Sequence, residues 1–144
     1  RKTQIPTRWI DQGAEEAIVV VEVPNRYLAG ITEVALKNHF ADKTNWRKML
    51  TNTYDAVDLV QEKAKVQAWL PDEVREYFSL EKNEIIAMHY PVAAYPAKVN
   101  SLNLDKTPFY QGQLIGVKGQ YLLFQDGTVF NVRSYEGYVV QIAI

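Results

Sequence analysis

A row of polar side chains along one predicted helix has the residue types that phosphate chemistry requires. At 100° per residue, Arg26, Gly30, Glu33 and Lys37 fall on one stripe of a helix predicted over residues 25–40. A carboxylate beside a lysine could hold a divalent metal ion next to a phosphate group. The alternative is a solvated helix face on which Glu33 and Lys37 form an ordinary i,i+4 ion pair. Glycine inside a helix costs about 1 kcal/mol relative to alanine, so Gly30 predicts that another group approaches the backbone closely there.

Two further groups of residues could contact phosphate. Arg8 precedes Trp9 in a short helix predicted over residues 5–13, and the guanidinium fork suits phosphate oxygens. The alternative is a surface arginine beside a buried tryptophan. A second group of residues is basic and aromatic and could contact a nucleic-acid backbone. The alternative is an ordinary helix surface around one buried ring. This second group consists of Lys43, Trp46, Arg47 and Lys48.

Other catalytic and nucleotide-binding motifs are missing from the sequence. His39 and His89 are the only histidines, and no HxxxH or paired-carboxylate spacing surrounds them, which favours surface or structural roles. The sequence has no GxSxG elbow, phosphate loop or GxGxxG motif. The glycine-rich run GQLIGVKGQ lies between predicted strands and therefore indicates a hairpin or a bulge.

Composition indicates an ordinary globular protein of one domain or two small lobes. The chain has 144 residues, of which 47% are hydrophobic and 23% charged. It has no cysteine, which excludes disulfides and cysteine-based zinc sites. No run approaches the roughly 18 apolar residues of a membrane span, and the start lacks a signal-peptide core. We therefore predict a cytoplasmic protein without membrane contact. Arg1 in place of methionine indicates a fragment or a processed product.

Charge is nearly balanced, which excludes a general polyanion binder. The net charge is −1, but residues 51–90 carry four basic and eight acidic side chains. Residues 1–50 carry eight basic and six acidic side chains, and residues 91–144 carry four and three. Any phosphate-binding surface should therefore lie outside the middle of the chain.

The first eighty residues are predicted to be helical around one strand. The β-branched run AIVVVEV at residues 17–23 indicates a buried strand, followed by a helix that Asn25 can cap. Asn52 or Thr53 is expected to cap a long helix that ends before Pro71. The predicted helices cover residues 5–13, 25–40, 44–50, 53–70 and 71–78.

After residue 80 the pattern becomes strand-like. The strand-like runs are IIAMHY, YPAKVNSLNL, GQLIGVKG, YLLF, TVFNVR and GYVVQIAI. Asp126-Gly127 is typical of a tight turn, and Ser134–Gly137 indicates a second one. The sequence thus predicts an α+β protein with an α/β lobe and helical extension over residues 1–80, and an antiparallel meander or small barrel over residues 81–144.

Four stretches of the chain resemble an uncharacterised bacterial protein family, a domain of unknown function. They are IPTRWIDQGAEEA, PNRYLAGITEVALK, DKTNWRKML and GVKGQYLLFQDGTVFNVRSYEGYVV. The resemblance spans nearly the whole chain. It implies no activity, because none is assigned to that family.

The first lobe is also similar to the GIY-YIG nuclease fold without its first strands. By this resemblance, Arg8 matches the arginine that steadies the phosphate, and the run AIVVVEV matches the third strand. Glu33 in EVALK matches the glutamate that binds a divalent metal such as Mg2+, and Lys37 gives electrostatic support. The tyrosines that position water would lie before Arg1, so the resemblance implies an inactive chain and a catalytic full-length protein.

Three functional hypotheses remain open at this point. The first is a metal-dependent phosphodiesterase acting on nucleic acid, with Arg8, Glu33 and Lys37 at its site. The second is a noncatalytic module that binds nucleic acid or protein. The third is a ligand-binding β lobe that uses Lys118, Tyr121, Arg133 and Tyr138. If strands belong before Arg1, the strand at 17–23 has a free edge, which predicts a homo-oligomer through strand pairing.

Overall fold

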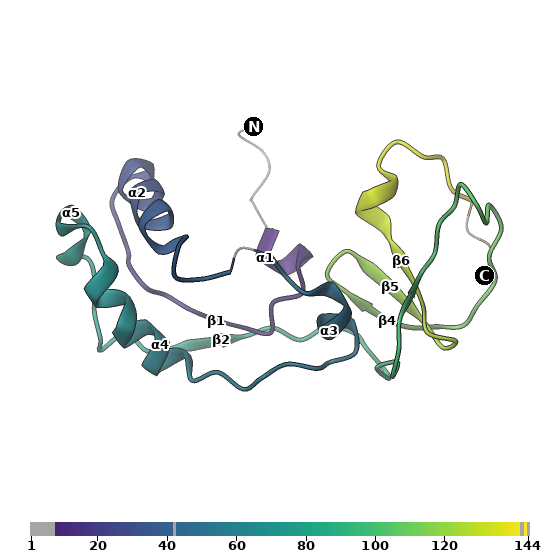
Figure 1. The fold of residues 1–144 in the computed structure, drawn as a ribbon, viewed down its shortest axis with the longest axis horizontal. Helices are drawn as coiled ribbons and strands as arrows, with labels where there is room; N and C mark the ends of the chain where they lie inside the picture. The colour runs from purple at the N-terminus through teal and green to yellow at the C-terminus, as the bar shows by residue number, and fades with distance from the viewer. Residues whose placement is uncertain (1–7, 42, 142, 144) are drawn as a thin grey trace. The chain divides into compact units, whose positions relative to one another are not determined.

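The chain folds into two compact units, each assembled from separated stretches of sequence (Figure 1). The computed structural model describes residues 8–41, 43–141 and 143, so residues 5–7 of the first predicted helix lie outside the described residues. Unit 1 contains Arg1–Ala14, Asn45–Tyr54 and His89–Ile144, and unit 2 contains Glu15–Thr44 and Asp55–Met88. This grouping differs from the consecutive lobes 1–80 and 81–144 that the sequence predicts.

Unit 1 combines short helices with a four-stranded sheet of strand order β3-β6-β5-β4. The last three strands form the predicted antiparallel meander, whereas β3 pairs with β6 in parallel, which was not predicted. The strand expected from GYVVQIAI is not formed over residues 138–141. The elements are α1 (Arg8–Asp11), α3 (Trp46–Leu50), β3 (Asn100–Ser101), β4 (Leu114–Lys118), β5 (Tyr121–Phe124), β6 (Thr128–Asn131) and the 3-10 helix η2 (Val132–Tyr135).

Glycines set both tight turns of the meander. Gly127 has φ +83°, and Asp126 Oδ1 accepts a hydrogen bond from Thr128 N at 2.8 Å, as the turn prediction requires. That bond is the main reason why the pKa of Asp126 lies below its usual value. Gly119 has φ +57° in the β4–β5 hairpin, and a Cβ there would lie 2.4 Å from the Asp11 carbonyl oxygen. The hairpin predicted from GQLIGVKGQ is thus confirmed.

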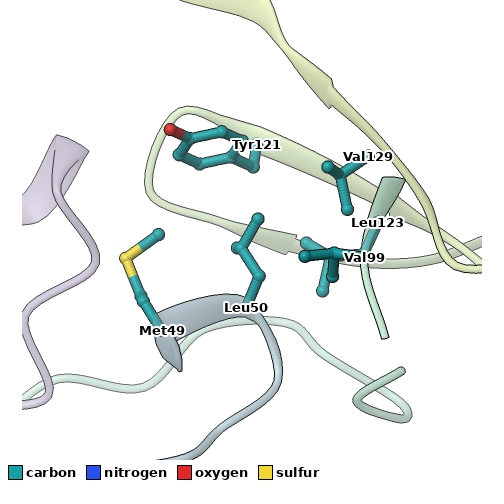
Figure 2. Close-up of a cluster of buried hydrophobic side chains, with 6 residues drawn as sticks. All are labelled: Met49, Leu50, Val99, Tyr121, Leu123 and Val129. Atoms are coloured by element: carbon teal, nitrogen blue, oxygen red, sulfur yellow. The ribbon is translucent and has the colours of Figure 1, made fainter. Parts of the chain in front are cut away.

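The core of unit 1 joins the sheet to a distant part of the chain. Met49 and Leu50 of α3 pack against side chains of the sheet (Figure 2). Trp46 stacks on Tyr121 with ring centroids 5.9 Å apart. Residues 45–54 therefore group with the C-terminal strands rather than with the preceding helices. The buried cluster consists of Met49, Leu50, Val99, Tyr121, Leu123 and Val129.

Unit 2 packs helices against a short antiparallel ribbon. Of the strand predicted at 17–23, only Ala17 and Ile18 lie in the regular strand β1, which begins at Glu16. An isolated bridge joins Val21 to Phe78. Val66, Leu70 and Val74 form the buried centre of the unit. The elements are β1 (Glu16–Ile18), α2 (Arg26–Leu36), α4 (Leu59–Val66), the 3-10 helix η1 (Gln67–Trp69), α5 (Asp72–Arg75) and β2 (Ile85–Ala87).

Two predictions for unit 2 are wrong. The run IIAMHY does not join the C-terminal sheet, because β2 pairs antiparallel with β1, with Ala17 opposite Ile86. The helix expected from residue 53 begins at Leu59, where Asp58 Oδ1 accepts hydrogen bonds of 3.0 Å from Val60 N and Gln61 N. Asp58 satisfies two free amides of the first turn, which makes it a strong N-cap.

Within the described residues, β1 pairs with β2 and with no second strand. One edge of this ribbon is therefore available for backbone pairing. The expected contact of this edge with another chain stays a prediction.

Candidate functional site

Helix α2 presents the predicted polar stripe to solvent. Its first turn is capped by Asn25, whose Oδ1 accepts a hydrogen bond from Leu28 N at 3.0 Å. Leu28, Ile31 and Leu36 pack on the buried centre of unit 2, so the opposite face of the helix points outward. The exposed side chains of this stripe are those of Arg26, Glu33 and Lys37.

The close approach expected at Gly30 is not found. Apart from Gly30, its two neighbours in the chain and the backbone of its own helix, no heavy atom of the described residues lies within 4 Å of the place where a Cβ would stand. Gly30 therefore leaves an open gap between the charged residues of the stripe. Its cost to helix stability has no packing explanation in this structure.

The ion pair expected for an ordinary solvated face is also missing. Glu33 and Lys37 are both described and make no ion pair with each other. In the described part of the chain, neither side chain has a hydrogen-bond or ion-pair partner. The carboxylate of Glu33 is thus accessible and uncommitted, which is what a metal ligand supplied by a surface helix requires.

Arg8 belongs to the other unit. It is the first residue of α1, which belongs to unit 1. Just after this helix, Gly13 N donates a hydrogen bond to Ile10 O at 2.8 Å. Glu33 and Lys37 belong to unit 2, so the cleft predicted between them and Arg8 stays a prediction. The neighbouring Trp9 is 46% exposed, which contradicts the alternative of a buried tryptophan.

The basic and aromatic group around Trp46 is divided between the units. Trp46, Arg47 and Lys48 lie on α3 in unit 1, whereas Lys43 lies in unit 2. Arg47 Cζ lies 4.3 Å from the centroid of the Trp46 ring, which is a cation–π contact. Arg47 and Lys48 are exposed, and Trp46 is half-buried against the core.

The residues predicted for a ligand-binding β lobe do not form one surface. Lys118 is fully buried, and its Nζ donates to Met49 O at 3.2 Å. Tyr121 belongs to the core, so neither residue can meet an external ligand. Arg133 pairs with Asp11 at 3.5 Å. Tyr138 OH donates to Asp105 Oδ1 at 2.8 Å, and this bond raises the pKa of Tyr138.

The histidines have the surface and structural roles that the sequence favours. His39 is exposed and stacks on Trp69 with ring centroids 3.9 Å apart and an interplanar angle of 3°. His89 is exposed as well. Among the described residues, no three histidine, cysteine, aspartate or glutamate side chains are grouped to hold a metal. A metal ion would therefore use few protein ligands.

Comparison with known proteins gives a family and no activity. A family model covers residues 1–140, and its description is a protein of unknown function (DUF2797). No curated protein and no solved structure matches the chain. The GIY-YIG resemblance and the bacterial origin stay predictions. No helix in the described ranges has the length and apolar character that crossing a membrane needs.

Proposed function

The chain belongs to the DUF2797 family, whose function is unknown, and we propose that it supplies the metal-binding face of a GIY-YIG-type phosphodiesterase acting on nucleic acid. One observation carries the proposal. The Glu33 carboxylate is exposed and unpaired within the described residues, on a helix stripe that also presents Arg26 and Lys37. Because no side chain of the described residues occupies this carboxylate, both of its oxygens are open to a metal ion.

A single carboxylate fits Mg2+ at such a site. Mg2+ keeps several water molecules and commonly takes one or two carboxylates together with substrate phosphates. The open space beside Gly30 leaves room for hydrated metal on the same stripe. When bound, the metal ion would neutralise charge on the phosphate.

The chain's own residues would bind and orient the nucleic acid. Glu33 would hold the metal ion, and Lys37, one turn later, would attract the non-bridging phosphate oxygens. Arg8 belongs to unit 1, and its role as a phosphate contact is what the GIY-YIG resemblance implies for it. No residue of this chain is assigned to position the attacking water, so we expect activity in the native protein and not in this chain alone.

Metal binding by the isolated chain tests the proposal without an activity assay. In an NMR titration with Mg2+, amide signals around Glu33 and Lys37 should shift and saturate. Glu33→Gln removes the negative charge at nearly constant shape, so these shifts should disappear. Glu73→Gln is a matched control, because Glu73 is an exposed carboxylate on α5 of the same unit. Equal shifts in the wild type and in Glu33→Gln would contradict the proposal.

A noncatalytic nucleic-acid-binding module is the second candidate function, and the Arg47–Trp46 contact favours it. Arginine held against an indole ring is a common element of single-strand binding surfaces. The sequence also left open a noncatalytic module that binds protein. No comparable contact among the described residues supports that function.

Fluorescence of Trp46 should report this binding in a chain whose other tryptophans are replaced by Trp9→Phe and Trp69→Phe. At low salt, a single-stranded oligonucleotide should change tryptophan emission, and the affinity should fall as salt is added. Arg47→Ala should weaken binding roughly threefold to tenfold, in line with one exposed cation–π and phosphate contact. The exposed Lys106 in unit 1 provides the control, and Lys106→Ala should have little effect. Identical losses in both variants would argue against a surface centred on α3.

A further inference from the structure

Two exposed apolar side chains lie beside the charged residues of helix α2. Tyr27 is 68% exposed and Val34 is 70% exposed, whereas other apolar residues of this helix pack on the buried centre of unit 2. A single exposed apolar residue is ordinary on a protein surface. What distinguishes these two is their alignment with each other and with the charged residues. Tyr27 and Val34 together are called the apolar row.

The apolar row follows the helix axis. Its two members are seven residues apart, so they lie within about 20° of each other around the helix and about 10 Å apart along it. Gly30 lies beside the row and carries no side chain, and the space at its Cβ position is open. No side chain at Gly30 therefore separates the apolar row from the charged residues on its other side.

The charged residues form a second row, parallel to the first. This charged row consists of Arg26, Glu33 and Lys37, all of them exposed. At 100° per residue, the charged row lies about 20–60° from Gly30 in one direction, and the apolar row lies about 40–60° from it in the other. Two of the charged residues are cations and Glu33 is the proposed metal ligand, so the charged row suits phosphate groups. Helix α2 thus presents a phosphate-binding side and an apolar side next to each other.

Single-stranded nucleic acid has the same two sides. Its phosphates follow the backbone, and its unpaired bases present flat faces that stack on aromatic side chains. In a duplex, neighbouring base pairs cover each base, so an aromatic ring on a surface helix has no base face to stack on. The two parallel rows therefore fit a single strand better than a duplex.

The Tyr27 ring is available for such a stack. In the part of the chain that the structure describes, this side chain has no hydrogen bond and no ring contact. Tyrosine also offers a large contact area with only two side-chain torsions to fix, so ordering it costs little entropy. We propose that Tyr27 stacks on a base of a single-stranded substrate while the charged row contacts the adjoining backbone. This substrate class rests on the proposed phosphodiesterase function of the same helix face.

Binding of oligonucleotides without metal tests the substrate class separately from the metal site. The parent chain for this experiment carries Arg47→Ala, which weakens the second candidate surface on α3. A fluorescently labelled single strand of mixed sequence, and the duplex of the same sequence, are titrated with this chain in low-salt buffer with EDTA. Tyr27→Ala should weaken binding of the single strand by about fivefold or more, because one base stack is lost. The same substitution should leave the affinity for the duplex unchanged.

Two further variants identify stacking as the cause. Tyr27→Phe keeps the ring and should bind the single strand within about twofold of the parent chain. Tyr54→Ala removes a tyrosine of unit 1 that is 61% exposed, and it should have no effect. Equal affinities of the parent chain and Tyr27→Ala for the single strand, or equal losses for single strand and duplex, would overturn the proposal. Since no metal ion is present in this assay, the Mg2+ titration of Glu33 remains the independent test of the proposed function.

Discussion

Replacing Glu33 by glutamine should reduce metal-dependent cleavage of nucleic acid by the native protein about 100-fold or more. A metal ion contributes several kcal/mol of charge stabilisation in the transition state, and each 1.36 kcal/mol corresponds to a tenfold change in rate. Glutamine keeps the size of the side chain and its exposed position on α2, but it removes the charge that holds the metal ion. The measurement is the single-turnover cleavage rate of a labelled oligonucleotide at saturating Mg2+.

The control for this experiment is Glu73→Gln, which should cleave like the wild type. Without metal, the oligonucleotide should bind Glu33→Gln at least as tightly as the wild type, because the substitution removes a negative charge that repels phosphate. Equal cleavage rates for the wild type and Glu33→Gln would contradict the assignment of Glu33 as the metal ligand.

Replacing Leu50 by alanine should destabilise unit 1 by about 2–5 kcal/mol. Leu50 is fully buried in the cluster that joins α3 to β5 and β6, and a buried leucine leaves a cavity when truncated to alanine. The loss is a large part of the stability of a domain of this size. It can be measured by urea denaturation, followed by the fluorescence of Trp46 in a chain that also carries Trp9→Phe and Trp69→Phe.

Leu114→Ala is the matched control for this loss. Leu114 lies on β4 and is exposed, so the same truncation should change the free energy of unfolding by less than about 0.5 kcal/mol. If Leu50→Ala were as stable as this control, α3 would not belong to the core of the C-terminal sheet. The interleaved unit described above would then need revision.

Local signals in the sequence predicted much of the secondary structure. Asn25 caps α2, and Gly127 turns the chain between β5 and β6, as expected from their residue types. The meander follows from the β-branched and aromatic runs, which favour strands whatever they pair with. These features depend on neighbours in sequence, which a sequence displays directly.

The pairing of distant segments could not be predicted in the same way. The run at residues 85–87 has the strand pattern but pairs with β1, and α3 packs into the C-terminal sheet. Both outcomes depend on which apolar faces meet in three dimensions. Two capping signals were also present near the start of this helix. The sequence predicted a helix from residue 53, but Asp58 caps it and α4 begins at Leu59.

The candidate site was foreseen only in part. Helical periodicity placed Glu33 and Lys37 correctly on an exposed face, but it gave no information about their lack of partners. The apolar row beside them was missed, although the seven-residue spacing of Tyr27 and Val34 is visible in the sequence.

The most direct test of the central claim is paramagnetic broadening by Mn2+ bound in place of Mg2+. We predict that, in this chain, substoichiometric Mn2+ broadens the amide signals of Glu33 and Lys37 on α2 more than those of the other helices of unit 2. The same addition to Glu33→Gln should leave both signals sharp. Broadening that spares α2, or that persists unchanged in Glu33→Gln, would contradict the assignment of this helix face as the metal site.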